Sequence, residues 1–103
     1  MSAETVAAQA GLAAIKPGMA VETFGLRQDW TVLALTLVPS DVALAPVGLL
    51  LAVRDHRYHP FVIELVYMDG GHLVAYQGAY HPTLQEALHE YLARHGRIDG
   101  TRA

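Results

Sequence analysis

Residues 61–80, FVIELVYMDGGHLVAYQGAY, contain two apolar runs separated by Asp69-Gly70-Gly71. Each run has the length of an ordinary β-strand. Glycines that follow an aspartate are typical of the tight turns that join antiparallel strands, because glycine adopts positive φ without steric cost. This stretch therefore predicts a β-hairpin.

Two registers fit this hairpin. If Gly70-Gly71 form the turn, Glu64 lies opposite Gln77, and if Asp69-Gly70 form it, Glu64 lies opposite Ala75. We prefer the first register because polar residues on facing strands pair best with each other. Glu64 is then expected to point outward beside Gln77. The other face is predicted to pack on a helix and holds Phe61, Ile63, Leu65 and Tyr67 with Val74, Tyr76 and Tyr80.

Three further apolar runs precede the hairpin, at Met19–Phe24, Trp30–Val38 and Val47–Val53. No helix-length pattern separates them, and parallel strands would need long crossover connections. The chain therefore predicts about five strands in a mostly antiparallel meander, either a sheet or a barrel-like roll. Trp30 is expected to anchor its core.

A helix is predicted before the strands. Residues 2–15 are rich in alanine, which favours helix, and Ser2 is suited to the N-cap. Lys16-Pro17-Gly18 then predicts a stop and a turn.

A second, amphipathic helix is predicted to follow the strands and pack on them. Thr83 and Glu86 have the spacing of a capping box, Glu90 and Arg94 that of a favourable ion pair, and Gly96 is expected to end the helix. Between Thr83 and Gly96, the residues at helical spacing that form the apolar stripe are Leu84, Ala87, Leu88, Tyr91 and Leu92. The chain is thus predicted to form one α+β domain at residues 1–96 with a flexible tail at 97–103.

Both faces of the predicted strands are apolar. Leu49-Leu50-Leu51, for example, presents leucine to either face of its strand. Two helices can cover one face of a small sheet, so the rest must be covered by curling of the sheet or by a second chain. Large exposed apolar patches are rare on soluble monomers, and a homodimer is therefore predicted.

The composition excludes several classes of function. The 103 residues are 52% apolar and 17% charged, carry a net charge of −3, and include no cysteine. A disulfide framework, a thiolate zinc site and a cysteine nucleophile are therefore excluded. The arginines are scattered rather than clustered, which argues against nucleic acid as a partner. The longest oily stretch, Val42–Val53, contains Pro46 and Gly48 and is too short to span a membrane, so a cytoplasmic protein is expected.

Motifs for metal, phosphate or nucleophilic chemistry are also missing. His56 and His59 form a close pair, but no second compact pair completes a zinc site. His89-Glu90 begins an HExxH pattern that Ala93 breaks. Ser40 lacks the glycines of a nucleophile elbow, and no phosphate-binding loop occurs. No metal, no cofactor and no catalytic residue are therefore predicted, and an enzyme is the less favoured interpretation.

Two groups of residues remain as candidate binding sites. The first is the polar segment between two oily strands, formed by Arg54, Asp55, His56, Arg57, Tyr58 and His59. Arginine and tyrosine are enriched at binding hot spots, so this segment predicts a recognition loop. The second group, Tyr76, Tyr80 and His81, could line a pocket between sheet and helix in which histidine acts as an acid or base.

These observations predict a small non-enzymatic protein-binding module of accessory, regulatory or inhibitor type, acting as a homodimer. The alternative is a small-molecule-binding roll or small enzyme that uses the tyrosine- and histidine-lined pocket.

Overall fold

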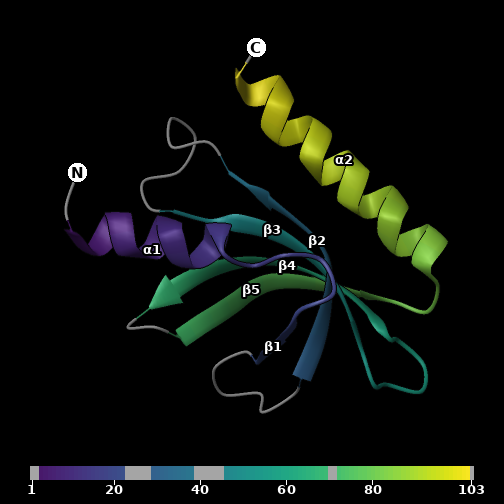
Figure 1. Ribbon diagram of the computed structural model, residues 1–103. Coiled ribbons are helices and arrows are strands. Elements are labelled where there is room, and N and C mark those ends of the chain that lie inside the picture. Colours follow the sequence, from purple (N-terminus) through teal and green to yellow (C-terminus); the bar gives the residue numbers. More distant parts are fainter. Residues whose placement is uncertain (1–2, 23–28, 39–45, 70–71, 103) are drawn as a thin grey trace.

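The computed structural model describes residues 3–22, 29–38, 46–69 and 72–102, and it leaves the side chains of residues 4, 5, 29 and 97–102 out of that description. The elements are α1 (Ala3–Ala13), β1 (Ala20–Glu22), β2 (Asp29–Leu37), β3 (Gly48–Arg54), β4 (Phe61–Asp69), β5 (His72–His81) and α2 (Leu84–Arg102). The predicted α+β fold is confirmed (Figure 1). The predicted cap at Ser2, the strand end at Phe24 and the turn at Gly70-Gly71 lie outside the described residues.

The strands form one antiparallel sheet in the order β1-β2-β3-β4-β5, the meander that the short connections predict. The sheet curls into a half-barrel with α2 across it (Figure 1). Its register shifts by one residue twice, through an extra residue between Val32 and Ala34 in β2 and through an extra residue in β5 opposite the Ile63–Leu65 stretch of β4. Such bulges increase the local twist of a sheet and so favour its curling.

The face of the sheet toward α1, here called the α1 face, carries the larger buried cluster. Leu12 of α1 packs there against side chains from every strand between β2 and β5: Trp30, Val32, Leu50, Ala52, Val62, Val66 and Leu73. Trp30 is fully buried, so its predicted role as a core anchor is confirmed. Because one short helix covers only part of this width, the curl of the strands themselves closes the rest.

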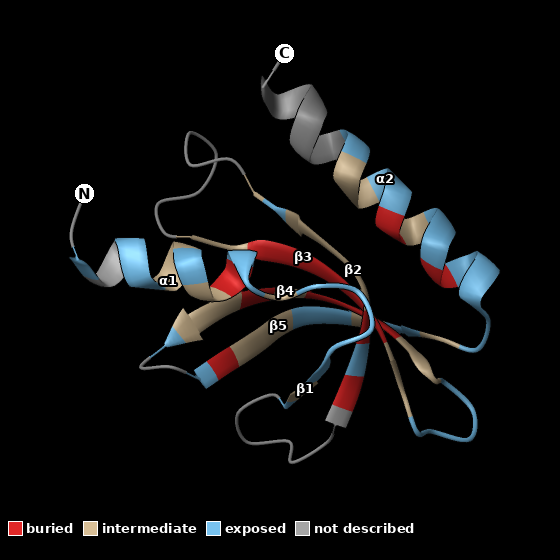
Figure 2. Ribbon diagram, in the orientation of Figure 1, coloured by how far each residue is buried: buried red, intermediate tan, exposed pale blue. Residues whose placement is uncertain are grey.

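The opposite face, here called the α2 face, is covered by the C-terminal helix. Ala87 and Tyr91 pack against Leu49, Leu51 and Ile63. The Tyr91 hydroxyl and Thr36 Oγ1 on β2 share a hydrogen bond of 2.6 Å, which satisfies the buried phenol. The prediction that the face of Phe61, Ile63 and Leu65 packs on a helix is thus confirmed. Figure 2 shows the buried positions concentrated in β3 and β4, between the two helices.

The hairpin follows the preferred register from its turn only as far as Leu65. Leu65 pairs with Tyr76, but beyond the bulge Val62 pairs with Tyr80. Tyr80 was predicted to share a face with Phe61, and this prediction is wrong because the extra residue in β5 moves Tyr80 to the α1 face. The bulge lies at Gln77, whose φ of 53° is left-handed.

The C-terminal helix begins as predicted and ends later. The Glu86 N–H donates to Thr83 Oγ1 at 3.2 Å, and Glu90 pairs with Arg94 at 3.0 Å. The predicted stop at Gly96 is wrong, because α2 continues to Arg102. Gly96 lacks the positive φ that a glycine stop requires, whereas Gly18, after α1, has φ 89° and turns the chain into β1.

Candidate functional site

The predicted recognition loop is an ordered turn between β3 and β4. The backbone N–H of Arg54 donates to the carbonyl of Pro60 at 2.8 Å and closes the turn. His56 Nδ1 accepts the N–H groups of Tyr58 and His59 at 3.2 and 2.9 Å. The imidazole of His56 therefore stabilises the turn by accepting two backbone hydrogen bonds.

The two arginines of this loop have different surroundings. Arg54 Nε donates to the His59 carbonyl at 3.2 Å, and its guanidinium lies 4.4 Å from the centre of the Tyr80 ring. Arg57 lies over the ring of Tyr58, which is 63% exposed. Arg57 and Tyr58 thus face outward as a recognition site requires, while Arg54 connects the loop to the sheet.

The second predicted group is divided between the two faces of the sheet. Tyr76 contacts Tyr67 edge to face on the α2 face, with ring centres 5.7 Å apart. Tyr80 lies on the α1 face because of the bulge. His81 follows on the α2 face, where its Nε2 lies 3.4 Å from Glu90 Oε1. The structure therefore does not bring these three side chains together around one cavity.

Glu64 is buried rather than outward-facing, which corrects the expectation from the sequence. Its side chain is 4% exposed, and the hydroxyl of Tyr80 donates to Oε1 at 3.0 Å. Burial raises the pKa of the Glu64 carboxyl, while the Tyr80 hydrogen bond and the charges of Arg94 and Arg54 oppose the rise. The pKa of the Tyr80 phenol is likewise raised, by burial and by the bond and charge of Glu64.

Gly78 makes the position of this carboxyl possible. A methyl group on Gly78 would overlap the Glu64 carboxyl. The bulge at Gln77 and the missing side chain at 78 thus create the space that Glu64 fills. On the helix side, Arg94 donates to the Gln77 carbonyl at 3.1 Å and ties α2 to the same bulge. Glu64, Tyr80 and Arg54 form a polar connection between the bulge and the β3–β4 loop.

The outward surface of α2 carries an uncovered apolar stripe. Leu84, Leu88 and Leu92 are 46%, 42% and 59% exposed, although sequence periodicity predicts that they face the sheet. The five apolar residues of the predicted stripe span about 140° of the circumference of α2, whereas Ala87 and Tyr91 are the two that are buried against the sheet. That excess width is a sequence signal that some of the stripe stays exposed, and reasoning from periodicity alone missed it.

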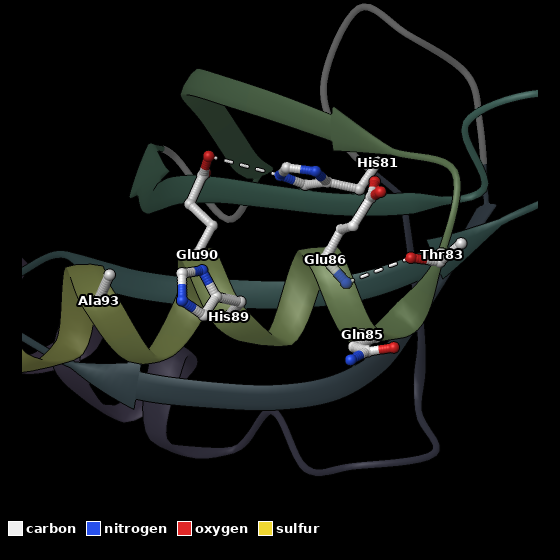
Figure 3. A pocket seen from close by; sticks show the side chains of 7 residues that line it. All are labelled: His81, Thr83, Gln85, Glu86, His89, Glu90 and Ala93. Atoms are coloured by element: carbon white, nitrogen blue, oxygen red, sulfur yellow. Dashed lines mark hydrogen bonds and ion pairs between the residues drawn. The ribbon is translucent and has the colours of Figure 1, made fainter.

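A shallow, open pocket lies between the end of β5 and α2. Figure 3 shows its lining residues, which are His81, Thr83, Gln85, Glu86, His89, Glu90 and Ala93. The His81–Glu90 pair spans it, and Arg94 holds the second oxygen of Glu90. His81 is the member of the predicted tyrosine and histidine group that reaches this pocket.

Among the residues that the structure describes, no group of three or more histidine and acidic side chains is placed to hold a metal ion. In the same residues, no helix is both long and apolar enough to cross a bilayer. Comparison with known proteins finds no matching family, no matching curated protein and no matching solved structure.

Proposed function

We propose that the chain is a small cytoplasmic protein-binding module, which acts through protein–protein contact as a homodimer in an accessory, regulatory or inhibitor role. The observation that carries the proposal is the row of exposed leucines on α2. Residues 84, 88 and 92 recur at i, i+4 and i+8, the spacing by which an amphipathic helix contacts a partner groove or helix.

The physical argument is the free energy of leaving these side chains in water. Fully burying a leucine side chain contributes about 1.5–3 kcal/mol, and each of the three is roughly half exposed. Contact with another protein would recover much of this contribution. The sheet does not cover these leucines, because Ala87 and Tyr91 form the buried apolar contact between α2 and the sheet.

The loop between β3 and β4 is proposed as a second contact region. Arg57 and Tyr58 combine a directed cation with a large exposed ring, the residue types enriched at binding hot spots. Because His56 already orders the loop, few degrees of freedom would be lost on binding.

A charge placed in the leucine stripe tests the proposal. Leu88→Glu is expected to abolish capture of partners from native lysate, with the circular dichroism spectrum unchanged because Leu88 is exposed. Ala93→Glu, at another exposed position of α2, is the matched control and should retain capture. Equal capture by both variants would exclude the stripe as the contact surface.

The recognition loop is tested separately. Arg57→Ala with Tyr58→Ala should weaken capture without changing the melting temperature. Arg54→Ala, in contrast, should lower the melting temperature, because Arg54 holds the His59 carbonyl and covers Tyr80. Undiminished capture by the Arg57 and Tyr58 double variant would remove the loop from the binding surface.

The pocket beside His81 supports a second candidate function, the binding of a small molecule. Its paired imidazole and carboxylate are groups that can accept and donate protons. A library of small cationic and polar compounds, screened by thermal shift, tests this alternative. A compound that stabilises the protein but not a His81→Ala variant would support it, and a screen without such a compound would count against it.

A further inference from the structure

Three polar side chains on the α1 face connect the interior of the sheet with the β3–β4 loop. On β4, Glu64 lies two residues from Val62, which is buried on the α1 face, and Tyr80 on β5 pairs with Val62. Arg54 ends β3 and lies two residues from Ala52, which is buried on the same face. Because side chains two residues apart in a strand point to the same side, the three polar side chains share this face.

Direct contacts join these side chains in order. The Tyr80 phenol donates to Glu64 Oε1 at 3.0 Å, and the Arg54 guanidinium lies 4.4 Å from the centre of the Tyr80 ring, which attracts a cation over its face. Arg54 Nε donates to the His59 carbonyl at 3.2 Å, and its backbone N–H donates to the Pro60 carbonyl at 2.8 Å. The hydrogen bond at Glu64 therefore reaches the loop through the Tyr80 ring and Arg54.

The charge of Glu64 decides how strongly this connection holds. A hydrogen bond to an ionised carboxylate is roughly twice as strong as one between neutral groups. The ionisable groups that face the carboxyl are Tyr80 on β5, Arg54 on β3 and Arg94 on α2. The described side chains of α1 and β2 contain no ionisable group. Protonation of Glu64 therefore weakens both its bond to Tyr80 and its attraction for Arg54.

We propose that Glu64 is a positioning residue for the β3–β4 loop, whose ionised form fixes Tyr80 and Arg54 and whose protonation loosens the loop. This inference rests on the proposed protein-binding function and names the regulation of its second contact region, around Arg57 and Tyr58. Contact of that region with a partner is therefore weaker below the pH at which Glu64 takes up a proton.

The loop and the whole fold respond to this proton in opposite directions. Burial favours the protonated carboxyl, so an ionised Glu64 lowers the free energy of unfolding of the chain. The same ionised carboxylate strengthens the bond that supports the loop. A residue that acts only on global stability would change both quantities in the same direction, so the two can be separated by measurement.

Hydrogen exchange of the Arg54 backbone N–H, followed by NMR without a partner, reports on the loop. Glu64→Gln keeps an oxygen that accepts from Tyr80 but removes the charge. At pH 7 the protection factor of this N–H is expected to be roughly threefold to tenfold lower in Glu64→Gln, a change equivalent to one ordinary hydrogen bond, although the variant resists urea better. At pH 4 the two proteins should be equally protected. Protonation of the loop histidines affects both alike, and Glu86→Gln, which removes an exposed carboxylate, should match the wild type.

Tyr80→Phe tests the route through the ring. It keeps the ring beneath Arg54 and removes the bond to Glu64, so it should lower the protection at pH 7, and adding Glu64→Gln should then change little. An undiminished effect of Glu64→Gln in the Tyr80→Phe background would overturn the inference. Equal protection in the wild type and Glu64→Gln at both pH values would also overturn it, as would greater protection in Glu64→Gln at pH 7.

These measurements need no partner, so their outcome is separate from that of the proposed function. If the loop responds as expected but the Arg57 and Tyr58 double variant still captures partners, the loop is not a contact region and the regulatory part of the inference fails. If the loop does not respond and the double variant loses capture, the proposed contact stands and the role of Glu64 is refuted.

Discussion

The sheet buries the carboxyl group of Glu64, and its neighbours compensate only in part for the lost hydration. An ionised carboxylate loses most of its hydration at 4% exposure, and one phenol hydrogen bond replaces only part of it. Arg54 and Arg94 add favourable charge from two sides, yet burial remains the larger effect on the carboxyl pKa. The protonated form of Glu64 is therefore stabilised by folding.

This pKa shift predicts the pH dependence of stability. A group whose pKa is raised by folding stabilises the native state below its usual pKa of 4.5, and this contribution is lost as the pH rises through the raised value. Glu64→Gln should remove that loss. At pH 7 the variant is expected to be more stable than the wild type by on the order of 1 kcal/mol.

Urea unfolding of both proteins between pH 4 and pH 7 measures this effect. The stability difference should be small at the acidic end and grow above it. Glu86→Gln removes an exposed carboxylate and serves as the control. A variant less stable than the wild type at pH 7 would mean that ionised Glu64 stabilises the fold.

Gly78 and Glu64 should depend on each other energetically. Gly78→Ala places a methyl group where the carboxyl lies, and a buried side chain has little room to move aside. We expect a loss of about 1–3 kcal/mol. In a Glu64→Ala background the same substitution should cost much less, and a double-mutant cycle by urea unfolding measures the coupling. If the two substitutions lower the free energy of unfolding additively, Glu64 and Gly78 are not in contact.

This pair of residues also marks where inference from sequence fails. The turn-proximal register of the hairpin was predictable, because matching of apolar and polar residues across the strands is local. The bulge was not predicted, although an isolated glycine within a strand, here Gly78, is typical of a bulge; the left-handed conformation itself falls on Gln77, a residue type that does not signal it. It arises from packing of Glu64 against Gly78, with Arg94 on a distant helix bonded to the Gln77 carbonyl.

At the scale of elements, α2 shows two limits of helical patterns. The capping residue Thr83 and the Glu90–Arg94 pair were predictable, since both follow from spacing within the helix. The C-terminal end of α2 was not predictable. A glycine stops a helix when the chain adopts positive φ at that residue, and at Gly96 it does not. Helical periodicity shows that a helix has an apolar side. It does not show how much of that side the sheet covers, and so it cannot tell which apolar residues are buried.

Continuation of α2 through Gly96 predicts a stabilising substitution. Alanine is favoured over glycine inside a helix by roughly 0.5–1 kcal/mol, and an added methyl group at position 96 meets no atom within 4 Å. Gly96→Ala should raise the free energy of unfolding by about that amount. Gly18→Ala should instead lower it, because φ 89° strains any residue with a side chain. Thermal melts of both variants measure the contrast, and a destabilised Gly96→Ala would indicate a helix that ends at Gly96.

At the scale of the whole molecule, three features bury the apolar side chains of the strands: the curl of the sheet, α1 and α2. The curl of the sheet and α1 cover one face, and α2 covers the middle of the other. The leucines on the free flank of α2 remain in water. Apolar content on both strand faces predicted the need for such covers, but only the arrangement of the elements shows which side chains stay exposed.

Self-association through the leucines of α2, as the proposed homodimer requires, makes stability depend on protein concentration. Association of folded chains stabilises them by mass action, so the melting temperature rises with concentration. For two chains of this length we expect a shift on the order of 3 °C for each tenfold increase, within the range where dimers form. The melting temperature of Leu88→Glu should not change with protein concentration. The wild type would behave in the same way if its leucines made no contact between chains. Differential scanning calorimetry over about two decades of concentration compares the two proteins, and equal, flat behaviour in both would exclude self-association through this surface.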